Sequence, residues 1–342
     1  MNYIRAAAAR DQATRMIEAL NRLRPGATDR LADSALAEIS TWAGFDVREI
    51  SENESAAGCS VAGAYLPGPP PVVGVVSSRS HARRDFTGLH ELGHHLQRTQ
   101  IDLIDVLEEQ PDQGLELEDA ACDAFAAEIL LPDTLAAAHL GTAGPTAAQI
   151  CDLWRASSAS RMAACVKAAQ HLPAPGHILL LDTDGQLVFA ASRGLPRPRR
   201  GSDQSTAAVL DRALANGHHR TEGRTRLRYR DGIRGDELYV QTTDMGGYIV
   251  AVLVTDQAPW KTFSPPAPDQ GPQAPWRACG YCDHDFRSFE TACSTCRAPK
   301  CPECGQCDCP PRVAARTCPG CNLLQPPAMF DPPAATHCRD CS

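Results

Sequence analysis

The cysteines are the feature of this sequence that most constrains its fold. Twelve of the sixteen lie between Cys279 and Cys341, near the end of the 342-residue chain. Most of them follow Cys-x2-Cys spacing, which places two thiolates on one tight turn. In a reducing compartment such a density of cysteines indicates metal ligands rather than disulfides. The sequence therefore predicts that residues 276–342 form a zinc-binding region that has little hydrophobic core and folds mainly through metal binding.

Four thiolates complete a closed tetrahedral zinc site, so twelve cysteines predict three structural zinc ions. The predicted ligands are Cys279, Cys282, Cys293, Cys296, Cys301, Cys304, Cys307, Cys309, Cys318, Cys321, Cys338 and Cys341. The last four resemble a zinc ribbon, with Phe330 as its small core. Among the first eight, a sequential and a cross-braced pairing both fit the spacing, and His284 or His337 could replace a cysteine. A linker with six prolines at residues 258–275 separates this region from the rest of the chain.

The segment His90-Glu91-Leu92-Gly93-His94 carries the main functional signal. Two histidines four residues apart lie on one face of a helix, so both imidazoles can reach one Zn²⁺. Glu91 lies beside His90 and can act as general base on a water at the metal without being a ligand itself. The same pattern also arises by chance on amphipathic helices, so the interpretation needs a third ligand.

A second helix, expected at residues 117–131, can supply that ligand. It begins with Glu118 and Asp119 and continues along a face of small residues, which lets it pack closely on the histidine helix. A carboxylate from this helix would complete the three protein ligands of a catalytic zinc, leaving a fourth position for water. The two helices together predict a zinc site of the metallopeptidase type.

Two separated stretches, Arg84–His94 and Phe125–Pro132, resemble the ImmA/IrrE family of metallo-endopeptidases. The first stretch has the family's Phe-Thr before a His-Glu-Leu-Gly-His core, and the second has its Phe-Ala run and closing leucines before a proline. The resemblance covers roughly residues 30–134. It implies that His90 and His94 are zinc ligands and that Glu91 is the catalytic base.

The resemblance leaves the third ligand open between Asp119 and Glu118. The family's glutamate lies six residues before the phenylalanine, which is the position of Asp119, whereas Glu118 has the family's residue type. The register favours Asp119 slightly, and both residues stay candidates. Asp123 matches the family's Asn/Asp position and would orient a ligand histidine, although a solvated place on the helix surface explains it equally well.

The hydrophobic periodicity predicts an α+β protein, with a mainly helical zinc-peptidase core that contains a small sheet, a second α+β domain and a zinc-ribbon tail. The peptidase domain is expected to span residues 1–134. Its elements are helices at 4–23, 29–44, 84–98 and 117–131 and a pair of strands at 60–66 and 72–78. An extended peptide substrate could pair with the edge of the strand at 72–76, unless Pro70 and Pro71 protect that edge.

Residues 135–172 resemble the helix-turn-helix-like segment that follows the peptidase unit in ImmA/IrrE proteins, with the turn at 157–160. Helices that merely pack on the peptidase core explain the pattern nearly as well. The order of elements at residues 173–257 resembles a GAF- or PAS-type sensor domain.

Arginines at alternate positions, Arg226, Arg228 and Arg230, give one strand of this domain a basic face. Guanidinium groups fit phosphates, so this face could bind nucleic acid or a phosphate ligand. A solvated face that balances an acidic chain is the favoured explanation, because aromatic stacking partners are few.

Composition excludes other classes of function. Forty-one acidic residues against 33 basic ones give a net charge of −8, which excludes a chain-wide basic surface for nucleic acid. The longest apolar run, Tyr248–Val254, is far shorter than the roughly 20 residues of a membrane-spanning helix. The first residues become charged before a signal segment could form. We therefore expect a cytoplasmic protein with no membrane partner.

The resemblance implies a zinc-dependent endopeptidase that cleaves a protein substrate, a helix-turn-helix transcriptional repressor, in a stress or mobile-element response. The alternative is a non-catalytic zinc-containing regulator that binds protein or nucleic acid through its zinc ribbons. A third hypothesis is a nucleic-acid-binding protein that uses the arginine strand as well as the ribbons. Glu91 separates the first two, because a structural zinc site requires no base beside it.

Overall fold

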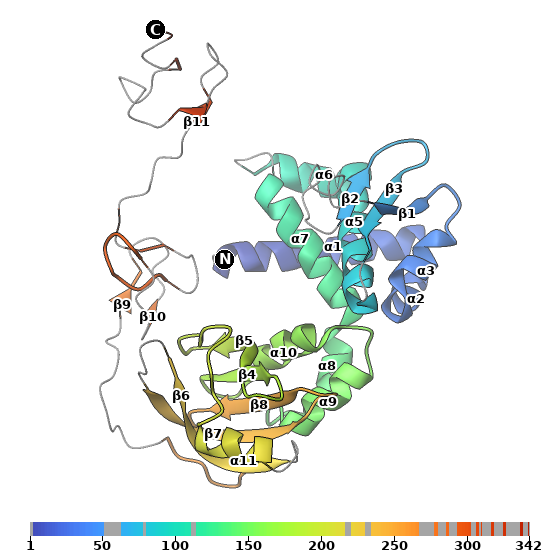
Figure 1. Cartoon of the computed structure of the whole chain (residues 1–342). Helices are drawn as coiled ribbons and strands as arrows, with labels where there is room; N and C mark the ends of the chain where they lie inside the picture. Colours follow the sequence, from blue (N-terminus) through green and yellow to red (C-terminus); the bar gives the residue numbers. More distant parts are fainter. Residues whose placement is uncertain are drawn as a thin grey trace.

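The structure is a computed structural model, which describes residues 3–50, 63–77, 80–110, 114–215, 220–229 and 234–266. Within the cysteine-rich tail it describes residues 277–279, 285–286, 293–301, 306–307, 309, 316–317, 324–325, 336–337 and 341. A helical body with a small sheet is followed by a second body built around a larger sheet, and then by the tail (Figure 1). The predicted mixed α+β architecture is confirmed.

The helical body contains the predicted helices and several short elements that the periodicity did not indicate. Its helices are α1 (Tyr3–Leu23), α2 (Ala27–Asp33), α3 (Ala35–Ser40), α5 (His81–Thr99), α6 (Ile101–Glu108) and α7 (Leu115–Leu130). The next helix, α8 (Asp133–Leu140), packs on α9 (Ala147–Arg155) of the second body (Figure 1). The single helix expected at 29–44 is wrong, because Ser34 is extended, with φ −159°, and divides it into α2 and α3. Both α6 and α8 have only eight residues, too few turns for a helical period to be distinct.

A three-stranded sheet covers one side of α5. Its strands are β1 (Asp46–Ile50), β2 (Gly63–Leu66) and β3 (Val72–Val76), in the order β1-β3-β2. β3 pairs with β1 in parallel and with β2 in antiparallel orientation. The idea that a substrate pairs with the edge of residues 72–76 is therefore wrong, because β3 is the central strand; within the described residues β2 lies at an edge.

Small residues bring α5 and α7 close together, as the sequence predicted. A Cβ atom added to Gly93 of α5 would lie 2.9 Å from the Cys122 Sγ of α7 and 3.0 Å from the Met16 Cε of α1. Ala121 and Ala126 of α7 are completely buried. Since α1, α5 and α7 meet at Gly93, the histidine helix is packed against both of the other helices there.

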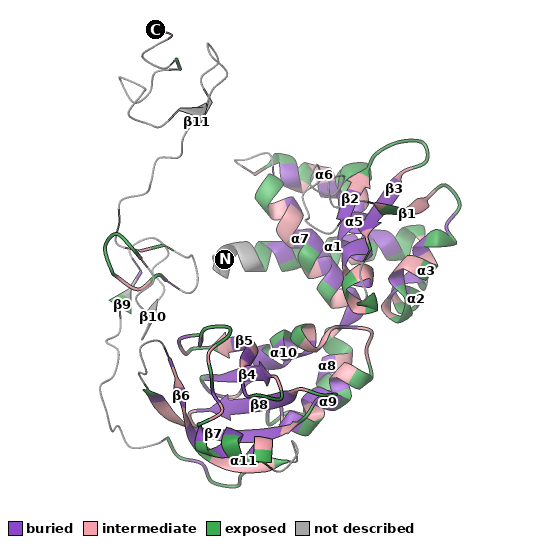
Figure 2. Cartoon of the chain, in the orientation of Figure 1, coloured by how far each residue is buried: buried purple, intermediate pink, exposed green. Residues whose placement is uncertain are grey.

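The second body is a five-stranded antiparallel sheet with helices on both faces. The strands are β4 (Gly176–Leu181), β5 (Leu187–Arg193), β6 (Thr221–Arg228), β7 (Arg234–Asp244) and β8 (Ile249–Val254), in the order β5-β4-β8-β7-β6. These strands and a helix, α11 (Ala208–Ala215), lie within residues 173–257, where the sequence predicts a second α+β domain. β4 and β8 are buried along their whole length (Figure 2).

Side chains alternate between the two faces of this sheet, as strand geometry requires. Ile178 and Leu180 pack in the core shared with α9 (Ala147–Arg155) and α10 (Arg161–Gln170), and that core continues into the helical body. Leu179 and Leu181 pack against α11 in a separate cluster. The turn expected at residues 157–160 lies between α9 and α10. Both helices thus form a layer of the second body, which favours packing helices over the helix-turn-helix interpretation.

The tail contains two short antiparallel hairpins. β9 (Arg277–Ala278) pairs with β10 (Asp285–Phe286), and β11 (Arg316–Thr317) pairs with β12 (Leu324–Gln325). Each hairpin encloses one Cys-x2-Cys pair of the sequence. Across the part of the chain that is described, none of the helices combines the length and the apolar character needed to cross a membrane.

Candidate metal centre

His90 and His94 are buried side chains on the middle of α5. This helix begins after Ser80, whose hydroxyl accepts a hydrogen bond from the Arg83 backbone N–H. The two histidine Nε2 atoms face each other at 3.2 Å, and their rings lie edge to face. Without a metal, one Nε2–H can donate a hydrogen bond to the other Nε2; with both nitrogens unprotonated, the same arrangement directs two lone pairs towards one point.

Two aspartates from α7 approach His90. The Oδ1 atom of Asp119 lies 3.4 Å from His90 Nε2, and the Oδ1 atom of Asp123 lies 2.9 Å from His90 Nδ1. Asp119 is half exposed, whereas the ring that it approaches is almost completely buried. The two carboxylates therefore differ in place: Asp119 lies on the side where the histidines converge, and Asp123 holds the opposite nitrogen of the same ring.

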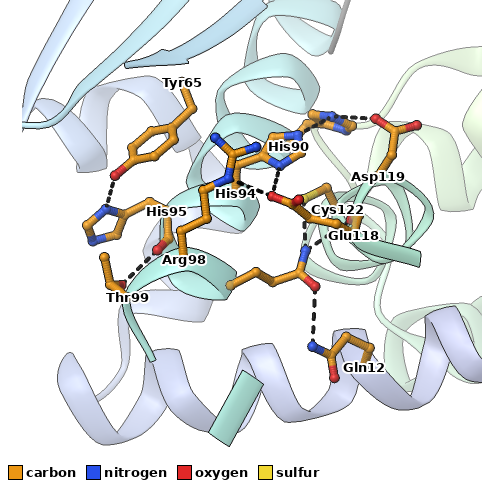
Figure 3. A network of polar contacts seen from close by, with 11 residues as sticks. Gln12, Tyr65, His90, His94, His95, Arg98, Thr99, Glu118, Asp119 and Cys122 are labelled. Atoms are coloured by element: carbon orange, nitrogen blue, oxygen red, sulfur yellow. Dashed lines mark hydrogen bonds and ion pairs between the residues drawn. The ribbon is translucent and has the colours of Figure 1, made fainter. Parts of the chain in front are cut away.

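Glu118 does not share the position of Asp119. Its Oε1 atom lies 2.7 Å from His94 Nδ1 and accepts a 2.8 Å hydrogen bond from Arg98 Nε (Figure 3). Burial alone raises the pKa of Glu118, but the hydrogen bonds of His94 and Arg98 outweigh it and lower the pKa below its ordinary value. Glu118 is thus an ionised carboxylate that holds the far nitrogen of His94, and its side chain points away from the Nε2 atoms.

Glu91 is completely buried, and within the described residues neither of its carboxylate oxygens makes a hydrogen bond of good geometry. Burial raises the pKa of Glu91 above its ordinary value, and the charges of His90 and His94 and the nearby Tyr65 backbone N–H oppose that rise only in part. The carboxylate lies against β2, because a Cβ atom on Gly63 would lie 2.6 Å from Glu91 Oε1. Burying a carboxylate without hydrogen-bond partners costs free energy. The site therefore indicates a bound non-protein group, such as a water, that would satisfy this carboxylate.

Cys122 is the residue of this site that the sequence interpretation missed. Its Sγ atom and the donor nitrogens of His90 and His94 all lie within 4.8 Å of one another. Cys122 is one helical turn after Glu118 and Asp119, a spacing that could have drawn attention to it. The sulfur accepts a hydrogen bond from Gln97 Nε2, and burial raises the pKa of the thiol to about 11.

Tyr65 and His95 lie near the centre, where each could act as an oxyanion donor or simply pack against its neighbours. The Tyr65 hydroxyl and His95 Nδ1 are 3.0 Å apart, so the two side chains satisfy each other. His95 also packs edge to face on Phe45, with ring centroids 4.6 Å apart. Burial lowers the pKa of His95. These contacts favour the packing explanation.

The residues present fit a zinc ion. Two nitrogens bound to one tetrahedral zinc at 2.0–2.1 Å are about 3.3 Å apart. The Nε2–Nε2 distance of 3.2 Å and the Asp119 Oδ1 to His90 Nε2 distance of 3.4 Å are both close to that value. The buried Glu91 carboxylate beside this point is what a bound water would satisfy. The donor set of two imidazoles and one carboxylate is typical of catalytic zinc.

The basic strand face has partners within the second body. Arg224 contacts Glu237 at 2.9 Å, Arg226 donates to the Gly235 carbonyl, and Arg228 donates to Thr206 Oγ1. Arg230 lies outside the described residues. These contacts use the guanidinium groups that a phosphate would need, which favours the explanation of a solvated, internally paired face.

In the tail, the structure brings four predicted ligands together: Cys293, Cys296, Cys307 and Cys309. Cys279, Cys301 and Cys341 are also described. The other predicted ligands, Cys282, Cys304, Cys318, Cys321 and Cys338, lie outside the described residues, as do His284 and Phe330. His337 is exposed and contacts Thr336.

Comparison with known proteins agrees with the resemblance seen in the sequence. Residues 53–167 match the family model described as the IrrE N-terminal-like domain. A solved structure described as a Mycobacterium tuberculosis transcriptional regulator is 17% identical over 74% of this chain and 76% of that chain, with a TM-score of 0.34, too low to support an argument. No curated protein matches the chain significantly. The predicted resemblance to the ImmA/IrrE family is confirmed for the region that carries the metal centre.

Proposed function

We propose that the chain is a zinc-dependent endopeptidase of the ImmA/IrrE type. The observation that carries the proposal is the pair of facing histidine Nε2 atoms, with the Asp119 carboxylate 3.4 Å from His90 Nε2, beside the buried Glu91 carboxylate. The match of residues 53–167 to the IrrE N-terminal-like domain supports the same conclusion. Neither a structural zinc nor a simple hydrophobic core requires an acid in that position.

His90, His94 and Asp119 would hold the zinc ion. Asp119 is chosen over Glu118 because its carboxylate lies on the Nε2 side of the histidines, whereas Glu118 binds His94 Nδ1. Asp123 and Glu118 would then act as the carboxylates behind the two ligand rings, which fix ring orientation and increase ligand basicity. Arg98 neutralises Glu118 and keeps it aimed at His94.

A bound zinc ion supplies Lewis acidity and lowers the pKa of a water in its open position. Glu91 is placed to take the proton of the attacking water at its carboxylate and to deliver it to the amide nitrogen of the leaving group. Its burial keeps bulk water away from the carboxylate during this transfer. The histidines and their carboxylate partners stay in place, so the transfer needs no movement of α5 or α7.

The substrate would be an extended peptide that lies along β2. Within the described residues β2 is an edge strand of its sheet, and its first residue, Gly63, touches Glu91. Sheet edges commonly bind peptides through main-chain hydrogen bonds. A helix-turn-helix repressor as the natural substrate rests on the family resemblance alone. We place the activity in the cytoplasm, because metal-binding thiolates of the tail need a reducing compartment.

The second body would act as a sensor domain of GAF or PAS type that controls this activity. Its support is the strand order β5-β4-β8-β7-β6 with helices on both faces, together with the hydrophobic core that α9 and α10 share with the helical body. Continuous packing of this kind gives a route by which a change in the sheet could reach α7 and α8.

The test is cleavage of the repressor encoded nearest to this chain, co-expressed with the wild type or with Glu91→Gln. We expect cleavage with the wild type and a rate at least about 100-fold lower with Glu91→Gln, since a general base contributes 10²–10⁴-fold. Zinc content should be unchanged, because Glu91 is not a ligand. Glu109→Gln, which changes an exposed glutamate of the same body, is the matched control. Cleavage that survives Glu91→Gln would rule out the proposed mechanism.

A second candidate is a non-catalytic zinc site, which one observation favours. Cys122 lies close enough to both histidines to join Asp119 as a fourth protein ligand. Four protein ligands would close the site and exclude water from the metal. The protein would then be a regulator that binds its partners through the tail. The buried Glu91 carboxylate argues against this candidate, because a closed site gives it no water to bind.

A further inference from the structure

The four cysteines that gather in the tail come from two separated segments. Cys293 and Cys296 form one pair, and Cys307 and Cys309 form the other. Between the two pairs the chain contains Cys301 and Cys304, so the group excludes its nearest neighbours in sequence. The grouping is therefore set by the path of the chain and not by proximity in the sequence.

The geometry of this group matches a four-thiolate zinc site. The Sγ atoms of Cys293 and Cys309 are 3.7 Å apart, and two sulfurs bound to one tetrahedral zinc at 2.3 Å are about 3.8 Å apart. The Cys296 backbone N–H donates to Cys293 Sγ at 3.4 Å, and the Arg297 N–H donates to the Cys293 carbonyl. These bonds turn the chain tightly, so that both thiols of the pair face the same point.

A second, smaller cluster lies beside this group. Cys279 and Cys301 are buried together with Phe286, at 5%, 2% and 7% exposure. The β9–β10 hairpin holds Cys279 and Phe286, while the Cys301 N–H donates to the Gln306 carbonyl at 2.7 Å. The first cysteine pair of the tail therefore meets the third pair, not the second.

We infer that residues 277–309 form a cross-braced module that binds two zinc ions. Cys293, Cys296, Cys307 and Cys309 bind one ion. Cys279 and Cys301 bind the other. The first cysteine pair along the chain is thereby joined to the third, and the second pair to the fourth. A sequential pairing would place Cys279 and Cys293 on the same ion.

Cross-bracing has a physical consequence for a segment with almost no core. Each metal closes a loop that contains a pair belonging to the other metal, so neither site can form its final geometry alone. Because metal binding supplies most of the folding free energy of such small segments, loss of one ion should weaken the binding of the other. The module would thus behave as one rigid unit at the end of the proline-rich linker.

The direct test is cadmium-113 NMR of the full chain after its zinc ions are replaced by cadmium. Correlations between cysteine Hβ protons and each cadmium show which residues share a metal. We expect one resonance to correlate with Cys293, Cys296, Cys307 and Cys309 and a different one with Cys279 and Cys301. Correlation of Cys279 and Cys293 with the same cadmium would overturn the inference. The experiment needs no substitution and does not depend on peptidase activity.

Zinc content of two matched serine variants of the full chain gives an independent test. Replacing Cys293, Cys296, Cys307 and Cys309 together should remove one of the module's ions, because all four belong to one site. Replacing Cys279, Cys282, Cys293 and Cys296 together should remove both ions, because these residues belong to two sites. The reverse pattern, two ions lost by the first variant and one by the second, is expected from sequential pairing and would overturn the inference. If the first variant also loses both ions through unfolding, the cadmium correlations decide.

Discussion

The two candidate metal-binding regions of this chain differ in whether the protein folds before or through metal binding. At the α5–α7 centre, His90 and His94 lie on a helix that a hydrophobic core already holds, and Asp123 and Glu118 fix their rings. In the tail, the buried cluster among the described residues consists of two cysteines and Phe286. The first region presents its ligands before a metal arrives, whereas the second has little besides the metal to organise it.

This difference explains why the donor atoms of the two regions differ. A preformed site can leave one metal position open, because the protein and not the metal maintains the geometry; that open position is what hydrolysis requires. A segment that depends on metal for folding must fill every coordination position of the metal with a protein ligand, as four thiolates do. The centre is therefore suited to chemistry and the tail to structure.

Removing metal should produce the largest difference in stability between the two regions. With excess chelator, we expect residues 277–341 to lose protection from amide hydrogen exchange, since a structural zinc contributes about 10–16 kcal/mol to folding. Helices α5 and α7 should stay protected, apart from small changes beside His90 and His94. Exchange measured peptide by peptide on the full chain checks this.

Restored protection after zinc is returned is the control for irreversible damage. Equal loss of protection in α5 and the tail would contradict the comparison, because it would show that the centre also needs metal to fold.

The carboxylates of the centre should differ in their effect on zinc affinity. We expect Asp119→Ala to raise the free zinc concentration at half-maximal cleavage more than 100-fold, since it removes a ligand. Glu118→Gln should raise it about 10–100-fold, the effect of losing a carboxylate behind a ligand ring. Cleavage in zinc buffers of increasing free concentration gives both values. A larger effect for Glu118→Gln than for Asp119→Ala would mean that the ligand assignment is reversed.

Acid should destabilise the folded bodies through a buried histidine that has no part in metal binding. Burial lowers the pKa of His177 from 6.5 to about 3, and its Nδ1 lies 2.7 Å from Ser192 Oγ. At a pH between these two pKa values, His177 is protonated in the unfolded chain and neutral in the folded chain. The free energy of unfolding should therefore fall as the pH drops below about 6.5, by about 1.4 kcal/mol per pH unit.

Urea unfolding between pH 7 and pH 5, with chelator present throughout, measures this slope. His177→Gln should flatten the slope by about one proton, whatever its effect on stability at pH 7. His81→Gln, which changes an exposed histidine, should leave it unchanged. An unaltered slope in His177→Gln would show that His177 does not carry the effect.

The smallest effect is expected at Cys122. Its sulfur packs against Gly93 and accepts a hydrogen bond from Gln97, so Cys122→Ala should change the zinc requirement for cleavage less than about threefold, well under the tenfold that 1.4 kcal/mol represents. Cys165→Ala, at another buried cysteine, is the matched control for a small loss of packing. A zinc requirement raised more than tenfold by Cys122→Ala alone would identify Cys122 as a ligand and favour the closed site.

Local patterns in the sequence were sufficient for the longer elements and for the histidine pair. The helical period of α1 and α5, and the continuous apolar runs of β4 and β8, extend over enough residues to be distinct. The short helices α6 and α8 and the strand β1 were missed, because their formation depends on packing: α6 lies against α5, α8 against α9, and β1 against β3. Such packing is not visible in a local pattern.

The choice of the third zinc ligand also depends on packing that a local sequence pattern does not show. The sequence placed Glu118 and Asp119 at the start of one helix but could not decide between them, because neighbouring residues on a helix differ in direction by about 100°. Only the crossing of α5 and α7 shows that Glu118 reaches His94 Nδ1 and that Asp119 reaches the Nε2 side. Cys122 was missed although it lies one helical turn after Glu118 and Asp119, because a lone cysteine on a helix is more often a small core residue than a ligand.

The most direct test is a crystal structure of the zinc-loaded protein with anomalous data collected at the zinc edge. The proposed centre predicts an anomalous peak between His90 Nε2, His94 Nε2 and Asp119 Oδ1, with a non-protein ligand in the fourth position and Glu91 within hydrogen-bond distance of it. A peak with Cys122 Sγ or Glu118 as a further protein ligand and no open position would contradict the peptidase assignment.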